Sequence, residues 1–314
     1  DSMVNHYTAA KRLRSDDAYT PEGKAGQRPD YAVTVYTKIL KEIYPDVPVV
    51  IGGIEASLRR VTHYDYWQDA LKPSILVESG ADWLCYGMGE RTMLEFTRAI
   101  EAGRNISDIR KIPQLAFYMD GRTKLKDAVI LNSYDRCCKD KVAFAENFHV
   151  IETYANMMQP PVLIEPVGKG YVQINPTWAP ATEKEMDSFW DLPFTKLPHP
   201  RYKGKHIPAF EMIKFSINTH RGCFGGCNFC TIAAHQGKFI QSRSEDSIIK
   251  EIKALNALPG FAGNISDVGA PTANMYGMRG KNPELCSKCR RKSCLFPSPC
   301  KNMDRSHERL LKLY

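Results

Sequence analysis

Three cysteines with the spacing Cys-x3-Cys-x2-Cys lie in one glycine-containing loop: Cys223, Cys227 and Cys230. Thiolates this close together can bind one compact soft-metal centre, and they leave one corner of a four-iron cube without a protein ligand. That iron would be open for chemistry. The neighbouring glycines let the backbone curl around such a centre, because glycine reaches positive φ angles without a steric penalty. The alternatives are a zinc knuckle or unconnected buried thiols.

A second group of cysteines follows with the spacing Cys-x2-Cys-x4-Cys-x5-Cys: Cys286, Cys289, Cys294 and Cys300. Four thiolates complete a tetrahedral zinc site or the cysteine set of an iron–sulfur cluster. The basic residues within 288–292 would lower thiol pKa values and balance an anionic centre, or they would face phosphate. Structural zinc, an auxiliary cluster, and thiols that are free of metal or oxidised are therefore three alternatives for this group.

The composition is that of an ordinary globular protein, with 43% hydrophobic and 25% charged residues in a chain of 314. This length favours two domains. No apolar run approaches the ~20 residues of a membrane-spanning helix, so we expect a soluble protein without a membrane partner. No basic-then-apolar signal segment opens the sequence, so we do not expect secretion. Ten cysteines, seven of them in the two groups, indicate metal ligation in the reducing cytoplasm. The net charge of +8 only weakly favours an anionic partner such as RNA.

The first half of the chain alternates between helical and strand-like segments. Residues 30–44 have apolar side chains on one helical face, which predicts a helix packed on a sheet. Two short β-rich runs, 47–51 and 81–86, are each followed by a glycine turn, at 52–53 and 87–89. This alternation predicts a doubly wound, Rossmann-like α/β domain, whose ligands bind at the carboxyl ends of the strands. The glycines there either approach a ligand or only make tight turns.

The second half begins after a proline-rich stretch, which predicts an extended connector with a short capped helix at 182–185. Residues 215–219 alternate like a strand and lead directly into the first cysteine loop. A helix is expected at 247–255 and a second strand at 263–269. Barrel sites are built from loops at the carboxyl ends of strands, so this order indicates the beginning of a barrel. We therefore predict an α/β domain over 1–158, a connector over 159–212 and an incomplete barrel domain over 213–314.

The first cysteine loop resembles the signature of the radical S-adenosylmethionine (SAM) superfamily, Cys-x3-Cys-x-aromatic-Cys, in which Phe229 is the aromatic residue. The resemblance implies a [4Fe-4S] cluster on the three thiolates, with the amino and carboxylate groups of SAM on the open iron. It also implies reductive cleavage of SAM to a 5'-deoxyadenosyl radical, which abstracts a hydrogen atom from a substrate. The protein would supply binding, orientation and electrostatics, and an electron donor of the flavodoxin or ferredoxin type would be its partner.

The same resemblance implies cofactor contacts from the end of the second barrel strand. By position, Gly269, Ala270 and Pro271 would contact the methionyl amino group, although the usual Gly-Gly-Glu is absent from this sequence. Phe229 is the remaining cofactor-binding candidate. Arg221 and Lys238 are candidates for neutralising the cluster and the cofactor carboxylate.

Further blocks at 50–60, 63–67 and 269–277 resemble the YgiQ family, which comprises bacterial radical SAM proteins of unassigned reaction. The first domain is also similar to the domain that precedes the barrel in cobalamin-dependent radical enzymes. The Asp-x-His-x-x-Gly loop that supplies a histidine to cobalt is not found, because the nearest segment, 62–66, has neither the order nor the glycine. We therefore do not expect cobalamin.

The barrel of such enzymes has about six strand–helix units of at least ~30 residues each, which exceeds the length of 213–314. We therefore expect an amino-terminal portion of a longer radical SAM enzyme. The alternative function is a metal-stabilised module that binds nucleic acid or protein without catalysis. A third interpretation is an inert portion whose cysteine loop lacks support from the missing strands. Two acidic residues beside predicted strand ends, Glu55 and Glu90, have surface or helix-capping roles as their simplest interpretation.

Overall fold

The structure is a computed structural model and describes residues 5–123, 125–270 and 274–314. At its centre lies a six-stranded sheet with the order β1-β4-β5-β8-β7-β6. The strands are β1 (Val50–Ile51), β4 (Trp83–Cys85), β5 (Leu115–Asp120), β6 (Val129–Ile130), β7 (Leu163–Val167) and β8 (Gly170–Ile174). The helices around it are α2 (Ala32–Ile43), α3 (Gly53–Leu58), α4 (Ile75–Ser79), α5 (Glu90–Glu101), α6 (Ile106–Ile109), α7 (Tyr134–Lys139) and α8 (Lys141–Ala155).

The predicted α/β class is confirmed, with a mixed rather than an all-parallel sheet. β1 pairs parallel with β4, and β6 pairs parallel with β7. The pairings of β4 with β5, β5 with β8 and β8 with β7 are antiparallel. The two-residue turn between β7 and β8 dictates the last of these, because a connection this short can join only antiparallel strands.

The side chains of β4 point alternately to the two faces of the sheet, which explains why helices cover both faces. Trp83 packs with Phe96 of α5 in one hydrophobic core, whereas Leu84 packs with Ala56 of α3 in the other. Successive side chains of a strand point to opposite faces, so a strand buried on both sides needs two layers of helix.

The helix predicted at 30–44 is confirmed as α2, but the prediction that its apolar face packs on the sheet is wrong. Tyr36, Ile39, Leu40 and Ile43 are between 43% and 59% exposed, while Thr34 and Thr37 are buried. The helix lies against α4. Helical spacing identifies an apolar face, but it does not specify the surface that covers it.

The first region also extends further than the predicted boundary at residue 158. The stretch 159–212 supplies both β7 and β8 to the sheet, so extended chain begins only after Ile174. The frequent prolines of this stretch indicated a connector, and Pro166 is the one that falls within a strand, where proline cannot donate a ladder hydrogen bond. It lies beyond the part of β7 that pairs with β6, where that donor is not needed.

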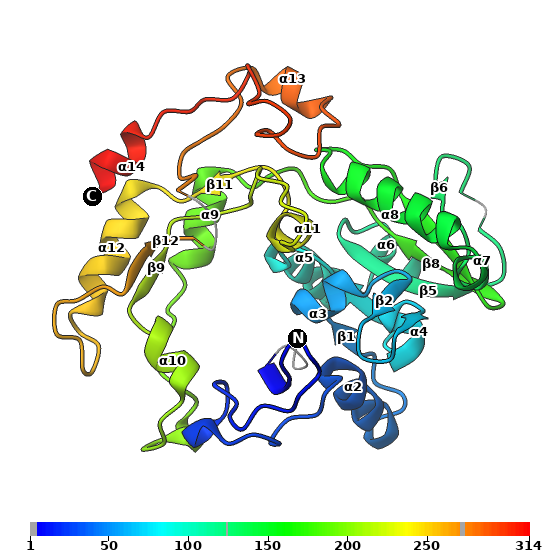
Figure 1. Ribbon diagram of the computed structural model, residues 1–314, viewed down its shortest axis with the longest axis horizontal. Helices are drawn as coiled ribbons and strands as arrows, with labels where there is room; N and C mark the ends of the chain where they lie inside the picture. The colour runs from blue at the N-terminus through cyan, green and yellow to red at the C-terminus, as the bar shows by residue number, and fades with distance from the viewer. Residues whose placement is uncertain (1–4, 124, 271–273) are drawn as a thin grey trace.

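A smaller body follows the sheet in the chain and lies on the other side of the molecule in Figure 1. Its core unit consists of β9 (Ser216–Asn218), α12 (Glu245–Leu255) and β12 (Asp267–Gly269), and β9 and β12 pair parallel as the predicted beginning of a barrel requires. The other elements that follow the sheet in the chain are α9 (Glu183–Trp190), η2 (Pro200–Tyr202), α10 (Pro208–Ile213), β10 (His220–Arg221), α11 (Ile232–Gln236), β11 (Gln241–Ser242), α13 (Pro283–Ser287) and α14 (Glu308–Leu313). Three short elements of the first region are η1 (Pro21–Gly23), β2 (His63–Asp65) and β3 (Ala70–Lys72). α9 carries the predicted capping box.

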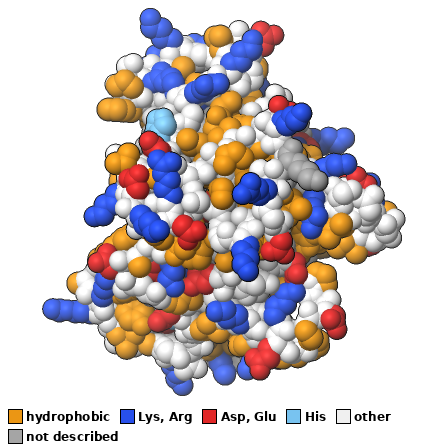
Figure 2. Space-filling model, turned by 90° about the vertical axis from the view of Figure 1, so that its right-hand side faces the viewer, with side chains coloured by type: hydrophobic (Ala, Val, Ile, Leu, Met, Phe, Trp, Pro, Cys, Tyr) orange, Lys and Arg blue, Asp and Glu red, His pale blue; other side chains and the backbone are white. Residues whose placement is uncertain are grey.

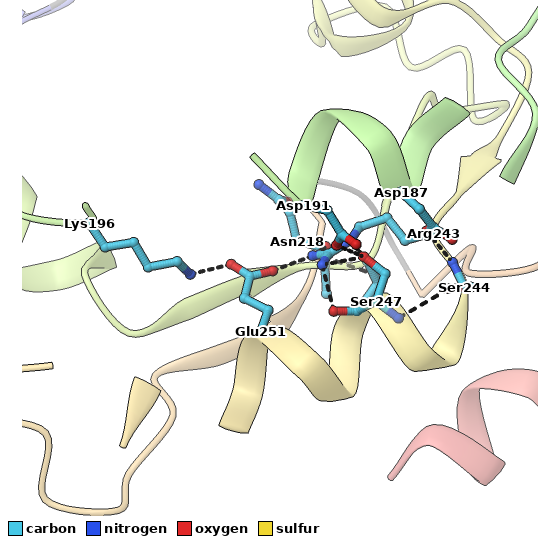
Figure 3. Close-up of polar contacts among 10 residues, drawn as sticks. Asp187, Asp191, Lys196, Asn218, Arg243, Ser244, Ser247 and Glu251 are labelled. Carbon is cyan, nitrogen blue, oxygen red and sulfur yellow. Dashed lines mark hydrogen bonds and ion pairs between the residues drawn. The ribbon is translucent and has the colours of Figure 1, made fainter. Parts of the chain in front are cut away.

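A buried guanidinium joins the parts of this smaller body (Figure 3). Arg243 is 0% exposed and donates to the carbonyl oxygen of Asn218 in β9 at 2.8 Å and to that of Ser247 in α12 at 3.0 Å. It also pairs with Glu251, which in turn pairs with Lys196 of the connector. The network therefore holds β9, whose end leads into the first cysteine loop.

No helix of the described residues is both long and apolar enough to cross a membrane.

Candidate functional site

The first cysteine loop begins directly after β10 and is closed by the end of α11 and the segment that follows it. Gly222 has a φ of +91°, and a side chain there would place its Cβ 2.2 Å from the carbonyl oxygen of Phe239. Only glycine therefore fits this position. The N–H of Cys223 donates to the carbonyl oxygen of Gly237 at 3.0 Å, and that of Gly222 to Gln236 Oε1 at 3.0 Å. These two hydrogen bonds and the glycine define the shape of the turn.

Two of the three thiols face one small space beside a glycine. A Cβ at Gly225 would lie 3.4 Å from Cys223 Sγ and 3.6 Å from Cys227 Sγ. Burial raises the pKa of Cys223, and the charges of Cys230 and Cys227 raise it further. In the described parts of the chain, no three Cys, His, Asp or Glu side chains are yet arranged as a metal site. The soft donors and the glycine cradle fit an iron–sulfur cluster, provided that the thiols draw together around it.

Of the four cofactor-binding candidates, Phe229 belongs to this loop, and the other three lie at the end of β12 or directly after it. Gly269 ends β12, and its carbonyl oxygen accepts from the backbone N–H of Thr219 at 2.7 Å, so the ends of β12 and β9 adjoin. Ala270 follows directly and is half-buried, whereas Pro271 lies outside the described residues. Phe229 is 91% exposed. Their contacts with SAM remain predictions.

The second cysteine group packs directly against the first loop, which the sequence did not reveal. The N–H of Cys294 donates to the carbonyl oxygen of Phe224 at 3.0 Å, and Ser293 Oγ donates to that of Gly225 at 2.7 Å. A Cβ at Gly226 would lie 2.9 Å from the Cβ of Ser293. The two groups are therefore neighbours, with Phe224 in a shared hydrophobic cluster that also contains three methionines.

Lys238, expected near the first loop, reaches the second group instead. It is 2% exposed, and its Nζ donates to the carbonyl oxygen of Arg291 at 2.7 Å and to Cys289 Sγ at 3.7 Å. Burial raises the pKa values of Cys286 and Cys294, and the charge of Lys238 opposes this rise. A buried ammonium beside several thiols is an arrangement that favours their ionised, metal-binding form.

The charged candidates near the strand ends are engaged in ion pairs. Arg221 pairs with Glu90 at 2.7 Å and lies over the ring of Trp190, 4.2 Å from its centroid. Glu55 pairs with Arg59 at 3.0 Å. On the face in Figure 2, basic side chains are interspersed with acidic ones, and this view gives no support to a nucleic-acid surface there.

A cavity of about 110 Å³ lies between the sheet and α11, which begins two residues after Cys230. It opens at the edge where β4 and β8 end and β5 begins, which is the edge predicted to bind ligands. Gly87 lines it, so a glycine turn chosen from the sequence does border a cavity. Arg60 and His235 also line it and were not singled out from the sequence, because nothing in their spacing marks residues so far apart as partners.

Comparison with known proteins places these features in a family context. The family model described as radical SAM N-terminal matches residues 1–216. A UPF0313 protein of Bacteroides thetaiotaomicron is 51% identical over the whole of this chain, which covers 53% of that protein. The UPF0313 protein YgiQ of Escherichia coli K12 is 42% identical, again over the whole chain and 50% of its own length. The chain thus spans about half the length of the curated relatives it matches.

A solved structure of lower similarity is that of TsrM from Kitasatospora setae, a radical S-adenosylmethionine methyltransferase with cobalamin and a [4Fe-4S] cluster bound. It is 18% identical with a TM-score of 0.39, covering 77% of this chain and 34% of that one. A TM-score of this size carries no argument about ligands. The expectation about cobalamin stays a prediction.

Proposed function

This chain belongs to the radical SAM N-terminal family, and on that premise we propose that it forms the amino-terminal portion of a radical SAM enzyme. The observation that carries the proposal is the three-thiol loop at the end of β9, in which Gly225 leaves room beside Cys223 and Cys227. Because the chain spans about half of its relatives, the reaction and the substrate belong to the proposal as well.

In this proposal, Cys223, Cys227 and Cys230 hold the [4Fe-4S] cluster through thiolate bonds. With SAM bound, the cluster supplies reductive cleavage to a 5'-deoxyadenosyl radical. The chain shapes the site, since the hydrogen bond from Gly222 to the last residue of α11 and that from Cys223 to Gly237 fix the loop. The end of β12 would contact the cofactor through Gly269 to Pro271, and Phe229 would cover it. A cytoplasmic flavodoxin or ferredoxin would deliver the electron.

We further propose a metal centre on the second group, Cys286, Cys289, Cys294 and Cys300. Its support is the buried ammonium of Lys238 beside Cys289, which would balance the negative charge of a four-thiolate site. Zinc and an auxiliary iron–sulfur cluster both suit four thiolates, so the geometry does not choose between them. The measured content of iron, sulfide and zinc identifies the metal.

The deciding experiment measures iron, sulfide and zinc per chain after anaerobic reconstitution. Changing Cys223, Cys227 and Cys230 together to Ala should remove about four irons. Cys138→Ala is the matched control, because this thiol is exposed and lies outside both groups, and it should remove none. Metal that remains in the triple variant belongs to the second group and should disappear when its four cysteines are changed to Ala.

Addition of SAM and a reductant should change the electron paramagnetic resonance spectrum of the parent protein and yield 5'-deoxyadenosine. Zinc in the first loop, or an unchanged iron content in the triple variant, would overturn the proposal. A reconstituted cluster without any response to SAM would instead favour the non-catalytic binding module.

A further inference from the structure

The cavity beside α11 contains a buried positive charge that no carboxylate of the described residues neutralises. Arg60 is 8% exposed. Its guanidinium donates to the carbonyl oxygen of Ser57 and lies over the ring of Tyr86, 4.8 Å from the centroid. A guanidinium has five N–H donors, and burying it without an anion is costly. Within the part of the chain that the structure describes, no carboxylate accepts from the remaining donors.

A second polar group of the same cavity is the imidazole of His235. His235 Nδ1 is buried and makes no hydrogen bond with any described residue. Burial lowers the pKa of His235, and the nearby charges of Arg60 and Arg221 lower it further. The imidazole is therefore neutral near pH 7 and can donate one N–H to an acceptor in the cavity.

The other charges that line the cavity cancel one another. Arg221 pairs with Glu90, and Arg91 pairs with Glu185 of α9. Arg60 is therefore the cation left over among the described lining residues. An uncompensated cation beside an unpaired histidine calls for an acceptor with negative charge.

The two groups come from different parts of the fold and are held in place rigidly. Gly87 has a φ of +68°, and a Cβ there would lie 2.9 Å from Gln114 Nε2 and 3.2 Å from the carbonyl oxygen of His235. Gln114 in turn donates to the carbonyl oxygens of Tyr86 and Met88. The glycine thus lets α11 approach the sheet edge closely, and this approach brings His235 and Arg60 to one cavity.

The rest of the wall is apolar and includes aromatic rings. The side chains that supply this surface are Met88, Tyr154, Met157, Met158, Trp178 and Phe189. Methionine and aromatic side chains adapt well to a flat apolar body. An apolar cavity of about 150 Å³ can hold a benzene molecule, so a volume of about 110 Å³ suits a group no larger than one aromatic ring.

We propose that this cavity binds a small molecule with a carboxylate or phosphate group on an aromatic or apolar body, with the anion held by Arg60 and His235. On the function proposed above, this molecule is the substrate, because α11 connects the cavity directly to the first cysteine loop. The binding itself needs no radical chemistry and can be measured without it.

The test is calorimetric titration of the full, reconstituted chain with phenyl phosphate, benzoate and uncharged benzyl alcohol. We expect at least one of the two anions to bind tenfold or more tightly than benzyl alcohol. The stronger of the two identifies the preferred anion. Equal binding of all three, or no binding of either anion, would overturn the proposal.

Variants then assign the binding to the two residues. Arg60→Met should weaken the binding of the more tightly bound anion at least tenfold, and His235→Phe should weaken the same binding by a smaller factor. Arg110→Met is the matched control, because the Arg110 guanidinium also lies over a ring, that of Phe117, but does not line the cavity. It should leave binding unchanged.

Circular dichroism of each variant checks that it is folded. If Arg60→Met is unfolded, His235→Phe decides alone. Parent-like anion binding in a folded Arg60→Met, or in His235→Phe when it decides alone, would overturn the proposal. The titration uses neither iron content nor 5'-deoxyadenosine as its signal, so its failure is distinguishable from failure of the proposed enzyme activity.

Discussion

Arg243 and Arg60 are both buried guanidinium groups, and their surroundings are opposite. Arg243 lies over Trp190 and has Glu251 and several backbone and hydroxyl oxygens as acceptors. Arg60 lies over Tyr86, and among the described residues its acceptor is the carbonyl oxygen of Ser57. The first cation is neutralised by the fold and joins its elements, whereas the second borders a cavity. The comparison teaches that the partners of a buried charge, rather than its burial, separate a structural role from a binding role.

The largest effect on stability is expected from Arg243→Met. This change leaves the carboxylate of Glu251 facing Lys196 alone and removes the donors to β9 and α12. Breaking a buried ion pair costs about 3–5 kcal/mol of unfolding free energy. Urea unfolding of the variant measures the loss. The double variant Arg243→Met/Glu251→Gln should recover part of the lost unfolding free energy. A loss below about 1 kcal/mol in Arg243→Met would show that Arg243 does not stabilise the fold.

The next effect concerns Glu165, a buried acid in β7 that accepts hydrogen bonds from the N–H of Thr62 and has no cation beside it among the described residues. Burial raises the pKa of Glu165 from 4.5 to about 7. The native state therefore binds its proton more tightly than the unfolded state, so the stability of the protein should fall as the pH rises from about 4.5 to 7. The full penalty of this group is about 3 kcal/mol above pH 7.

Glu165→Gln removes this titration while keeping an acceptor for Thr62. The difference in unfolding free energy between variant and parent should grow over that pH window and stay constant above it. Chemical unfolding at a series of pH values measures the difference. A difference that is independent of pH would show that Glu165 finds a compensating charge.

The smallest effect on stability is expected from Arg60→Met, in contrast with its effect on anion binding. The change removes a cation–π contact with Tyr86, but it also removes a buried charge that has no counterion in the described parts of the chain. These two contributions oppose each other, so unfolding free energy should stay within about 1 kcal/mol of the parent. A loss as large as that of Arg243→Met would mean that Arg60 serves the fold, and the contrast between the two residues would disappear.

Elements with strong local patterns were predictable from the sequence. The runs at 81–86, 215–219 and 247–255 appear as β4, β9 and α12, and the capping box at 182–185 begins α9. Local hydrogen bonds and side-chain periodicity determine such elements. The sheet pairing of β7 and β8 was missed, because its proline is compatible with a strand only in a particular register.

The sequence by itself determined the donor atoms of the candidate centres, because cysteines a few residues apart in a glycine loop remain neighbours in any fold that the loop adopts. Only the tertiary structure decided that the second cysteine group packs against the first, that Lys238 reaches Cys289, and that His235 meets Arg60 at one cavity. These contacts join residues far apart in the chain. Their formation depends on how whole helices and strands pack, which local spacing does not encode.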